Sequence, residues 1–233
     1  SSISATLQKT LNRLRQLNTQ DIQNSWQIST QDSAPTDIFD NSAATSKSTL
    51  GPQFWTKATQ NDRQHIAWGK GLQVQWFYQE IAVPADFDGY PLAGLCLRLA
   101  LTWWAEDAQI YVDGHLVQSG DLFECFTRIC LSEKVSPGQS FGIAIRLVSP
   151  GHDDGALVRS HLIYELPDIH LTLEPSFVAD ELAVLATLES HSQKQIEIEI
   201  AQLDWASLQR TQGIEDQSSK DVDFDLDLWQ ALS

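Results

Sequence analysis

The sequence has little or none of three features that would each mark a particular class of protein. It has only 15 Lys and Arg against 31 Asp and Glu, a formal net charge of −16, so its field repels nucleic-acid backbones and anionic membrane surfaces. It has no run approaching the roughly 18 apolar residues that a membrane-spanning helix needs. Residues 1–17 are polar with interspersed leucines, unlike a signal peptide. We therefore expect a cytoplasmic protein without nucleic-acid or membrane partners.

Cysteine is also scarce. The three cysteines, Cys96, Cys125 and Cys130, cannot all pair with one another, and a chain of 233 residues can bury a core that needs no disulfide. They are also too few for the clustered ligand pairs of a tetrahedral zinc site. We predict reduced thiols that bind no metal.

The N-terminal part of the chain, residues 1–50, combines two patterns. Apolar residues at spacings of three and four predict an amphipathic helix over residues 3–18, whose apolar stripe needs a partner surface. Residues 29–50 hold nine Ser or Thr among 22 residues and only scattered apolar ones, which predicts an irregular connector. This region is therefore expected to be a helix followed by a linker.

From residue 51 to 173 the apolar period changes to two, and eight strand-like runs follow one another. In residues 95–103 the leucines and one tryptophan share a single face, and residues 141–147 repeat the arrangement with Phe, Ile and Leu. The pair Asp113-Gly114 between two runs predicts a hairpin with a type I′ turn. Because no long helix separates the runs, we predict a mainly β fold, an antiparallel β-sandwich.

Residues 174–233 form a third region, which is acidic and mostly helical by pattern. It holds 13 acidic and three basic residues, a net charge of −10. Residues 177–188 have helical spacing, and a second helix could run from 193 to about 210. Residues 196–200 alternate Ile with Glu, so a strand start is the alternative there. We interpret the region as a linker toward a catalytic domain outside this chain.

Four residues are candidates for a sugar-binding site or a domain interface. Trp104 lies on the strand face opposite the leucines, so its indole is the one most expected to be exposed and able to stack on a sugar. His152, Asp153 and Asp154 lie in a polar loop between two glycines. Such a loop can hydrogen-bond a sugar, bind a cation or contact another domain, or it can simply be solvated.

No residues of the chain meet the requirements of a catalytic or metal site. Glycoside hydrolysis needs two carboxyl groups about 5 to 10 Å apart, whereas the adjacent Glu106 and Asp107 point to opposite faces of a strand. Residues 138–142 spell a nucleophile elbow, but a turn precedes the serine and a strand follows it. The acidic run 221–227 lacks the Gly and Glu of a calcium loop. We therefore assign no catalytic residue and no metal ligand.

Three segments carry a resemblance to a known domain type. They are Trp-Phe-Tyr-Gln-Glu-Ile-Ala-Val-Pro at 76–84, Ala-Gln-Ile-Tyr-Val-Asp-Gly at 108–114 and Val-Ser-Pro-Gly at 135–138. In this order they resemble the galactose-binding-like jelly roll that precedes the catalytic domains of several glycosidases. With a helix before it and acidic helices after it, the chain is most similar to the N-terminal region of the glycoside hydrolase family 38 α-mannosidases. Family 2 glycosidases share the sandwich but usually begin with it directly.

The resemblance implies a non-catalytic jelly-roll domain with flanking helices that packs against and supports the catalytic domain of an α-mannosidase. That missing domain would carry a zinc ion, whereas this chain has no His-x-His-x-Asp sequence and is expected to be inactive and free of cofactor by itself. Three alternatives remain open. The chain could be an autonomous carbohydrate-binding module that uses Trp104 and the 152–154 loop, the sandwich of a family 2-type glycosidase, or a domain that forms homo-oligomers through the helix at 3–18.

Overall fold

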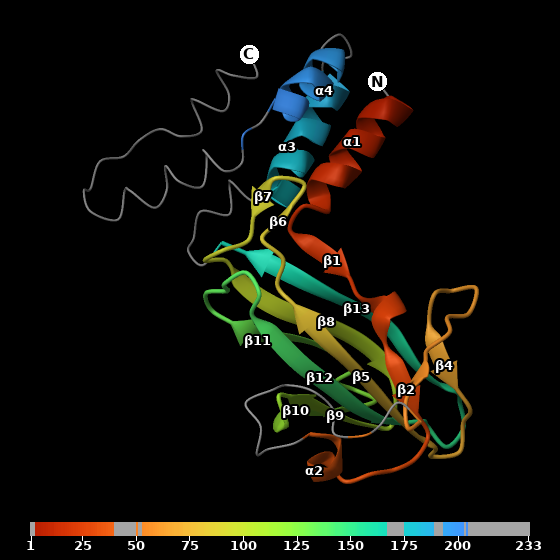
Figure 1. Cartoon of the computed structure of the whole chain (residues 1–233). Helices are drawn as coiled ribbons and strands as arrows, with labels where there is room; N and C mark the ends of the chain where they lie inside the picture. Colours follow the sequence, from red (N-terminus) through yellow and green to blue (C-terminus); the bar gives the residue numbers. More distant parts are fainter. Residues whose placement is uncertain are drawn as a thin grey trace.

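Two antiparallel sheets pack as a sandwich, with three helices gathered at one end (Figure 1). This arrangement confirms the predicted mainly β sandwich with an N-terminal helix and C-terminal helices. In the part of the chain that is described, no helix is long and apolar enough to cross a membrane. The computed structural model describes residues 3–39, 50, 53–166, 175–188, 193–202 and 204.

The five-stranded sheet has the order β1-β13-β8-β11, and β4 pairs with the first residues of β13. The six-stranded sheet has the order β10-β9-β12-β5-β2-β3, and β6 with β7 forms a separate hairpin. The first sheet consists of β1 (Thr19–Asp21), β4 (Ile66–Trp68), β8 (Cys96–Trp104), β11 (Phe126–Ser132) and β13 (Gly155–Glu165). The second consists of β2 (Gln27–Ser29), β3 (Thr56–Lys57), β5 (Val74–Ala82), β9 (Asp107–Val112), β10 (His115–Asp121) and β12 (Ser140–Val148). The hairpin consists of β6 (Asp86–Phe87) and β7 (Tyr90–Pro91).

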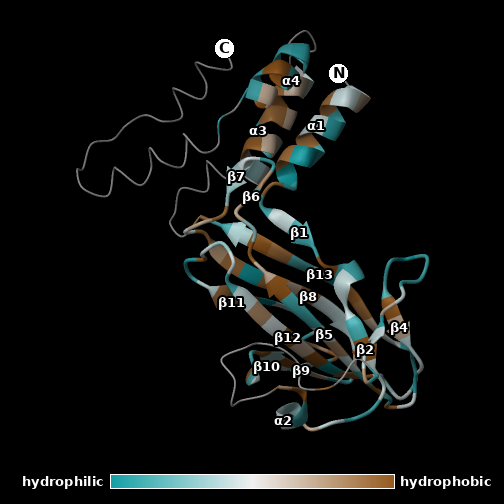
Figure 2. Ribbon diagram, viewed as in Figure 1, coloured by the Kyte–Doolittle hydropathy of each residue, from teal (hydrophilic) through white to brown (hydrophobic). Residues whose placement is uncertain are grey.

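The core lies between the sheets and is built from the apolar faces that the period of two predicts. The odd-numbered residues of 95–103 are all buried, and so are those of 141–147. Along β8 and β13, hydrophobic segments accordingly alternate with paler or hydrophilic ones (Figure 2). Asp113 and Gly114 both adopt positive φ, 48° and 83°, at the β9–β10 turn, as a type I′ hairpin requires.

The residues between the N-terminal helix and position 58 contribute more structure than their composition predicts. β1 joins one sheet and β2 the other. The short helix α2 (Pro35–Ile38) and the rings of Phe39 and Trp55 form a second apolar cluster with Trp76 and Tyr78 of β5. Part of the predicted connector thus covers the outer face of the six-stranded sheet.

An ion pair holds this cover in place. Both carboxylate oxygens of Asp32 accept hydrogen bonds from Arg146, at 2.9 and 2.8 Å. The hydrogen bond from Arg146 holds the pKa of Asp32 below its usual value. The charge on Arg146, a polar position among buried neighbours on β12, is thereby satisfied.

The helices α1 (Ala5–Arg15), α3 (Pro175–Leu188) and α4 (Gln193–Gln202) pack on one another. The Ser4 hydroxyl caps α1 by accepting the Leu7 amide at 3.1 Å, and the α1 stripe of Leu7, Leu11 and Leu14 is buried. The sequence offers this stripe as a contact for homo-oligomers. That interpretation is corrected, because the stripe is covered within the chain.

Residues 196–200 are helical, as part of α4, so the strand alternative there is wrong. The predicted strand region beyond residue 166 lies outside the described residues, as do most of the positions between the end of α4 and residue 210.

The three cysteines are free thiols. Cys96 on β8 and Cys130 on β11 place their sulfur atoms 3.8 Å apart. Burial is the main cause that raises the pKa of the Cys96 thiol, and its contact with Cys130 adds to the effect. Cys96 is therefore a protonated packing group at neutral pH.

Candidate functional site

The structure brings the four predicted site residues to one end of the five-stranded sheet. Trp104 is the last residue of β8 and pairs with Ala156 of β13, immediately after the loop that carries His152, Asp153 and Asp154. Trp104 is half-buried, and the three loop side chains are exposed. The predicted residues are thus neighbours in space, although they lie nearly 50 positions apart in the chain.

The carboxylates of this loop take part in local hydrogen bonds. Asp154 Oδ1 accepts the Lys70 backbone amide at 3.0 Å, and Asp153 Oδ1 accepts the amide of Asp154 at 2.9 Å. Gly155 follows, where an added Cβ would lie 2.5 Å from the Trp68 ring. The two aspartates therefore shape the loop, and the adjoining glycine lets β13 approach Trp68 closely.

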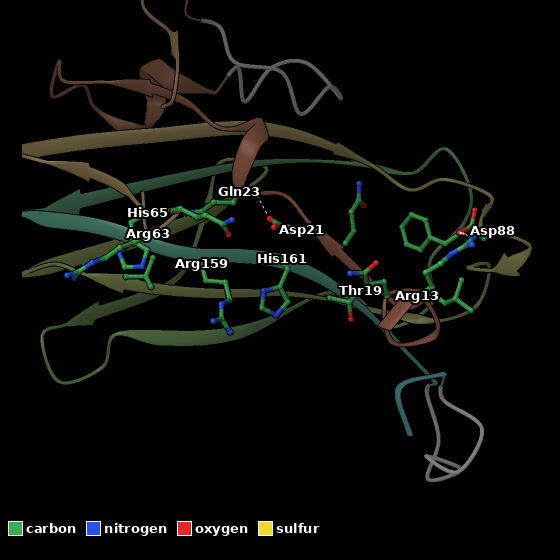
Figure 3. Close-up of a pocket in the computed structure, with 15 residues that line it drawn as sticks. Arg13, Thr19, Asp21, Gln23, Arg63, His65, Asp88, Arg159 and His161 are labelled. Carbon is green, nitrogen blue, oxygen red and sulfur yellow. Dashed lines mark hydrogen bonds and ion pairs between the residues drawn. The ribbon is translucent and has the colours of Figure 1, made fainter. Parts of the chain in front are cut away.

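A separate group of charged and polar side chains lines a pocket of about 710 Å³ along β1 and β13. We call it the β1 pocket. It extends from the C-terminal end of α1 to the loop before β4, with Arg63 and His65 at one end, Arg159 and His161 in the middle and Arg13 at the other end (Figure 3). Three arginines and two histidines thus line one cavity of a strongly acidic protein.

A β-bulge aims Arg159 and His161 into this pocket. The pairing of β13 with β8 shifts register between Leu157 and Arg159. Before the shift an odd-numbered residue, Leu157, faces the core, whereas after it the even-numbered Ser160 and Leu162 do. The inserted residue therefore turns Arg159 and His161 to the outer face of the sheet, where an uninterrupted strand would have buried them.

A buried polar network adjoins the pocket through Gln23, a lining residue at the start of the η1 turn (Gln23–Ser25). The Trp26 indole donates to Ser160 Oγ at 2.7 Å, and the Ser160 hydroxyl donates to Gln23 Oε1 at 2.6 Å. The Gln23 amide nitrogen donates to the Leu157 carbonyl at 2.8 Å. The network satisfies groups that are expensive to bury alone, and it fixes β1 and η1 against β13.

The charges in the pocket are only partly balanced. Burial, followed by the nearby charge of Arg159, lowers the pKa of His161, while Asp21, its cross-strand partner on β1, acts in the opposite direction. Arg13 forms a long ion pair with Asp88, at 3.7 Å. Within the described residues, no carboxylate forms an ion pair with Arg63 or Arg159. The pocket thus presents positive charge to solvent.

The donors in the pocket are those that hold anions rather than metals. Guanidinium groups offer several N–H donors and no lone pair, so they pair with carboxylate or phosphate oxygens. Over the described part of the chain, no three His, Cys, Asp or Glu side chains come together in a way that could hold a metal ion. The Asp107 carboxylate, considered above for catalysis, accepts a hydrogen bond from Arg146 at 3.4 Å.

Sequence reasoning missed the β1 pocket because its lining comes from separate parts of the chain, α1, the loop before β4, and β13. The one local signal is that the leucine alternation fails in residues 157–162, where Arg and His occupy what would be core positions. A break of that kind in a strand indicates a bulge.

No family model matches the chain, and no curated protein matches it. Among solved structures, a glycosyl hydrolase family 2 member from Bacteroides cellulosilyticus is similar with 14% identity and a TM-score of 0.47, over 65% of this chain and 21% of that chain. A β-glucuronidase from Bacteroides uniformis is similar with 15% identity and a TM-score of 0.42, over 63% of this chain and 17% of that chain. One from Ruminococcus gnavus has 12% identity and a TM-score of 0.41, over 64% and 29%. The chain thus spans 17–29% of the length of these structures.

Proposed function

We propose that the chain is a non-catalytic accessory part of a glycoside hydrolase, and that its sandwich packs against and supports the catalytic domain of that enzyme. The three segments that carry the resemblance to a glycosidase jelly roll support this. Residues 76–84 include most of β5, residues 108–114 include β9 and its turn, and residues 135–138 lead into β12. These three strands are neighbours in the order β9-β12-β5, so the resemblance concerns one contiguous part of one sheet.

The observation that carries the proposal is a set of exposed apolar side chains on β10, β11 and the loop between them, which we call the β10–β11 patch. Phe123 is 92% exposed and Phe126 70%, and Leu116 and Val117 of β10 are 55% and 45% exposed. Single exposed apolar residues are ordinary, but four along β10, β11 and the loop that connects these two strands are what a domain or protein interface leaves bare.

The loop that presents Phe123 is tightly built. Asp121 Oδ1 accepts the amides of Phe123 and Glu124 at 2.8 and 3.0 Å. At Gly120 an added Cβ would lie 2.7 Å from both the Glu124 carbonyl oxygen and the Trp103 ring. The backbone on either side of Phe123 is therefore fixed against the core, which leaves its ring directed away from it.

Two parent enzymes fit the proposal. A family 38 α-mannosidase is favoured by the helix that precedes the sandwich, since α1 packs with α3 and α4 into a separate helical unit beside the sheets. A family 2-type glycosidase is favoured by the sandwich itself. The zinc ion that family 38 implies would belong to the catalytic domain, because the described residues of this chain offer no ligand set for it.

The test is the coding sequence that follows Ser233, together with an assay of the 233-residue chain. We expect a catalytic domain to follow, with a His-x-His-x-Asp zinc sequence for an α-mannosidase or a pair of catalytic carboxylates without it for a family 2-type enzyme. We expect no turnover of aryl α-mannosides or aryl β-glycosides by the chain, with or without zinc. Turnover, or a downstream region unrelated to glycosidases, would overturn the proposal.

A further inference from the structure

The β1 pocket concentrates positive charge in a protein that has little of it. The whole chain has 15 Lys and Arg, and three of these line this one cavity with two histidines. At a net charge of −16, counter-charges for them are abundant in the sequence, yet Arg63 and Arg159 form no ion pair within the described residues. Asp21 and Asp88 also line the pocket, and Asp88 pairs with Arg13, so Arg63 and Arg159 are the arginines left to hold an anionic ligand.

The pocket also has groups that a simple anion would not use. Four glutamines, a threonine and a phenylalanine line it together with the charged residues. Gln20 Oε1 is buried without a hydrogen-bond partner among the described residues, and a carbonyl oxygen can only accept. A ligand that satisfies it must donate a hydrogen bond, as a hydroxyl does and as a sulfate dianion or the dianion of a phosphate ester does not. The side chains that line the pocket therefore favour a ligand with both carboxylates and hydroxyls.

The positions of the cations indicate the length of the ligand. Arg63 with His65, Arg159 with His161, and Arg13 occur in succession along the pocket rather than around one point (Figure 3). Its volume of about 710 Å³ is within the range of ligand clefts. One carboxylate could pair with only one of these groups, so an elongated ligand with repeated negative charge fits the lining best.

We infer that the β1 pocket binds an acidic oligosaccharide, whose carboxylates pair with Arg159 and Arg63 and whose hydroxyls bond to the glutamine amides, Gln20 among them. The site does not depend on the proposed accessory role. β1 and β11 are opposite edges of the five-stranded sheet, so the pocket and the β10–β11 patch are separate surfaces. Binding to the pocket and packing through the patch can therefore succeed or fail independently.

Binding is expected to be accompanied by proton uptake at His161. In the free protein, burial and the charge of Arg159 lower the pKa of His161 and favour its neutral ring, and Arg128 of β11 adds a smaller effect in the same direction. Asp21 of β1 acts in the opposite direction. A carboxylate beside Arg159 offsets the repulsion that Arg159 exerts on the protonated ring. Affinity should therefore increase as the pH falls from 7.5 toward 5.5.

The test is calorimetric titration of the full chain with tetragalacturonate, its fully methyl-esterified form, a tetraglutamate peptide and sodium sulfate. We expect tetragalacturonate to bind more tightly than the other three. Arg159→Gln and Arg63→Gln should each weaken it about tenfold or more, which is the loss of a charge-assisted hydrogen bond. Lys134→Gln, an exposed charge outside the pocket, is the matched control and should leave the affinity unchanged.

His161→Gln should keep binding near its neutral-pH value and lose the increase at low pH, and unchanged melting temperatures of the variants confirm folding. The inference is overturned if the methyl ester binds equally well, if Lys134→Gln loses as much affinity as Arg159→Gln, or if no titration shows binding. Tighter binding of tetraglutamate would overturn it in favour of a peptide site, and equal binding of sulfate in favour of a simple anion site.

Discussion

The two edges of the five-stranded sheet have opposite chemistry. At the β1 edge, arginines, histidines and amides surround a cavity and lie over a buried polar network. At the β11 edge, Phe126 and the neighbouring Phe123 present bare aromatic rings to solvent. The same sandwich thus offers one edge suited to a hydrated, charged ligand and another suited to a dry contact with protein. Net charge and average composition reveal neither.

The difference has a structural cause at each edge. At the β1 edge the bulge at residues 157–159 turns charged residues outward and brings Ser160 inward, where Trp26 and Gln23 satisfy it. At the β11 edge the Asp121 turn over Trp103 directs an aromatic side chain away from the core. One edge is joined to the core by hydrogen bonds and the other by close packing, so mutations should affect the two edges differently.

The largest difference is expected between two aromatic truncations. Trp26→Ala removes a fully buried indole that packs edge-on against Phe77 and donates to Ser160, and should lower the free energy of unfolding by about 3–5 kcal/mol. Phe123→Ala, at the other edge, should change it by less than about 0.5 kcal/mol. Urea denaturation of both variants measures the contrast, and equal losses would show that the two edges are not distinct.

The polar network should be the next most sensitive feature. Ser160→Ala leaves the Trp26 indole without an acceptor and Gln23 Oε1 without a donor, which should cost about 1–3 kcal/mol of stability. Ser119→Ala on the exposed strand β10 is the matched control and should be close to neutral. A wild-type midpoint for Ser160→Ala in chemical denaturation would contradict the assigned network.

At the opposite edge, the close approach at Gly120 can be tested in the same way. Gly120→Ala places a methyl group against the Trp103 ring and the Glu124 carbonyl, so the loop must shift, at a cost of about 1–2 kcal/mol. Gly151→Ala, where an added Cβ meets nothing within 4 Å, provides the comparison. If both substitutions proved equally mild, the loop would not be fixed against the core.

The β10–β11 patch should contribute little to the stability of the fold but should bind apolar molecules or another domain. The double variant Phe123→Ser with Phe126→Ser should change unfolding free energy by less than about 0.5 kcal/mol, since both rings are already in water. It should, however, reduce the fluorescence of a bound apolar dye. Undiminished dye fluorescence would show that the exposed rings do not form a binding surface.

The smallest effect is a pH dependence at the β1 edge. Because the pKa of His161 lies below the usual 6.5, the unfolded chain binds this proton more tightly than the folded one. The contribution of neutral His161 to the free energy of unfolding is therefore fully present above about pH 6.5, and it decreases as the pH falls through the lowered pKa. His161→Gln should make stability between pH 7 and 5 less dependent on pH, and an identical slope in both proteins would exclude His161 as its source.

The hairpin and the leucine faces could be predicted because each follows from local chemistry. Asp113-Gly114 tolerates the backbone conformation of the turn, and alternating apolar residues must face one side of a strand. Trp104 and the 152–154 loop were found as separate candidates, and the pairing of β8 with β13 makes them neighbours. Their role in sugar binding or domain contact stays a prediction.

The sequence by itself determined the antiparallel sandwich, the helix at its start and the helices at its end. The reason is that apolar residues with a period of two or of 3.6 identify the face of each strand or helix that is buried. Only the tertiary structure decided that β1 joins one sheet and β2 the other, and that α3 and α4 cover the α1 stripe. It also decided that Arg13, Arg63 and Arg159 line one cavity. Each of these depends on which distant segments meet. The spacing of apolar residues along the chain predicts which of them are buried. The position of a polar residue in the sequence does not predict which distant side chains it will meet.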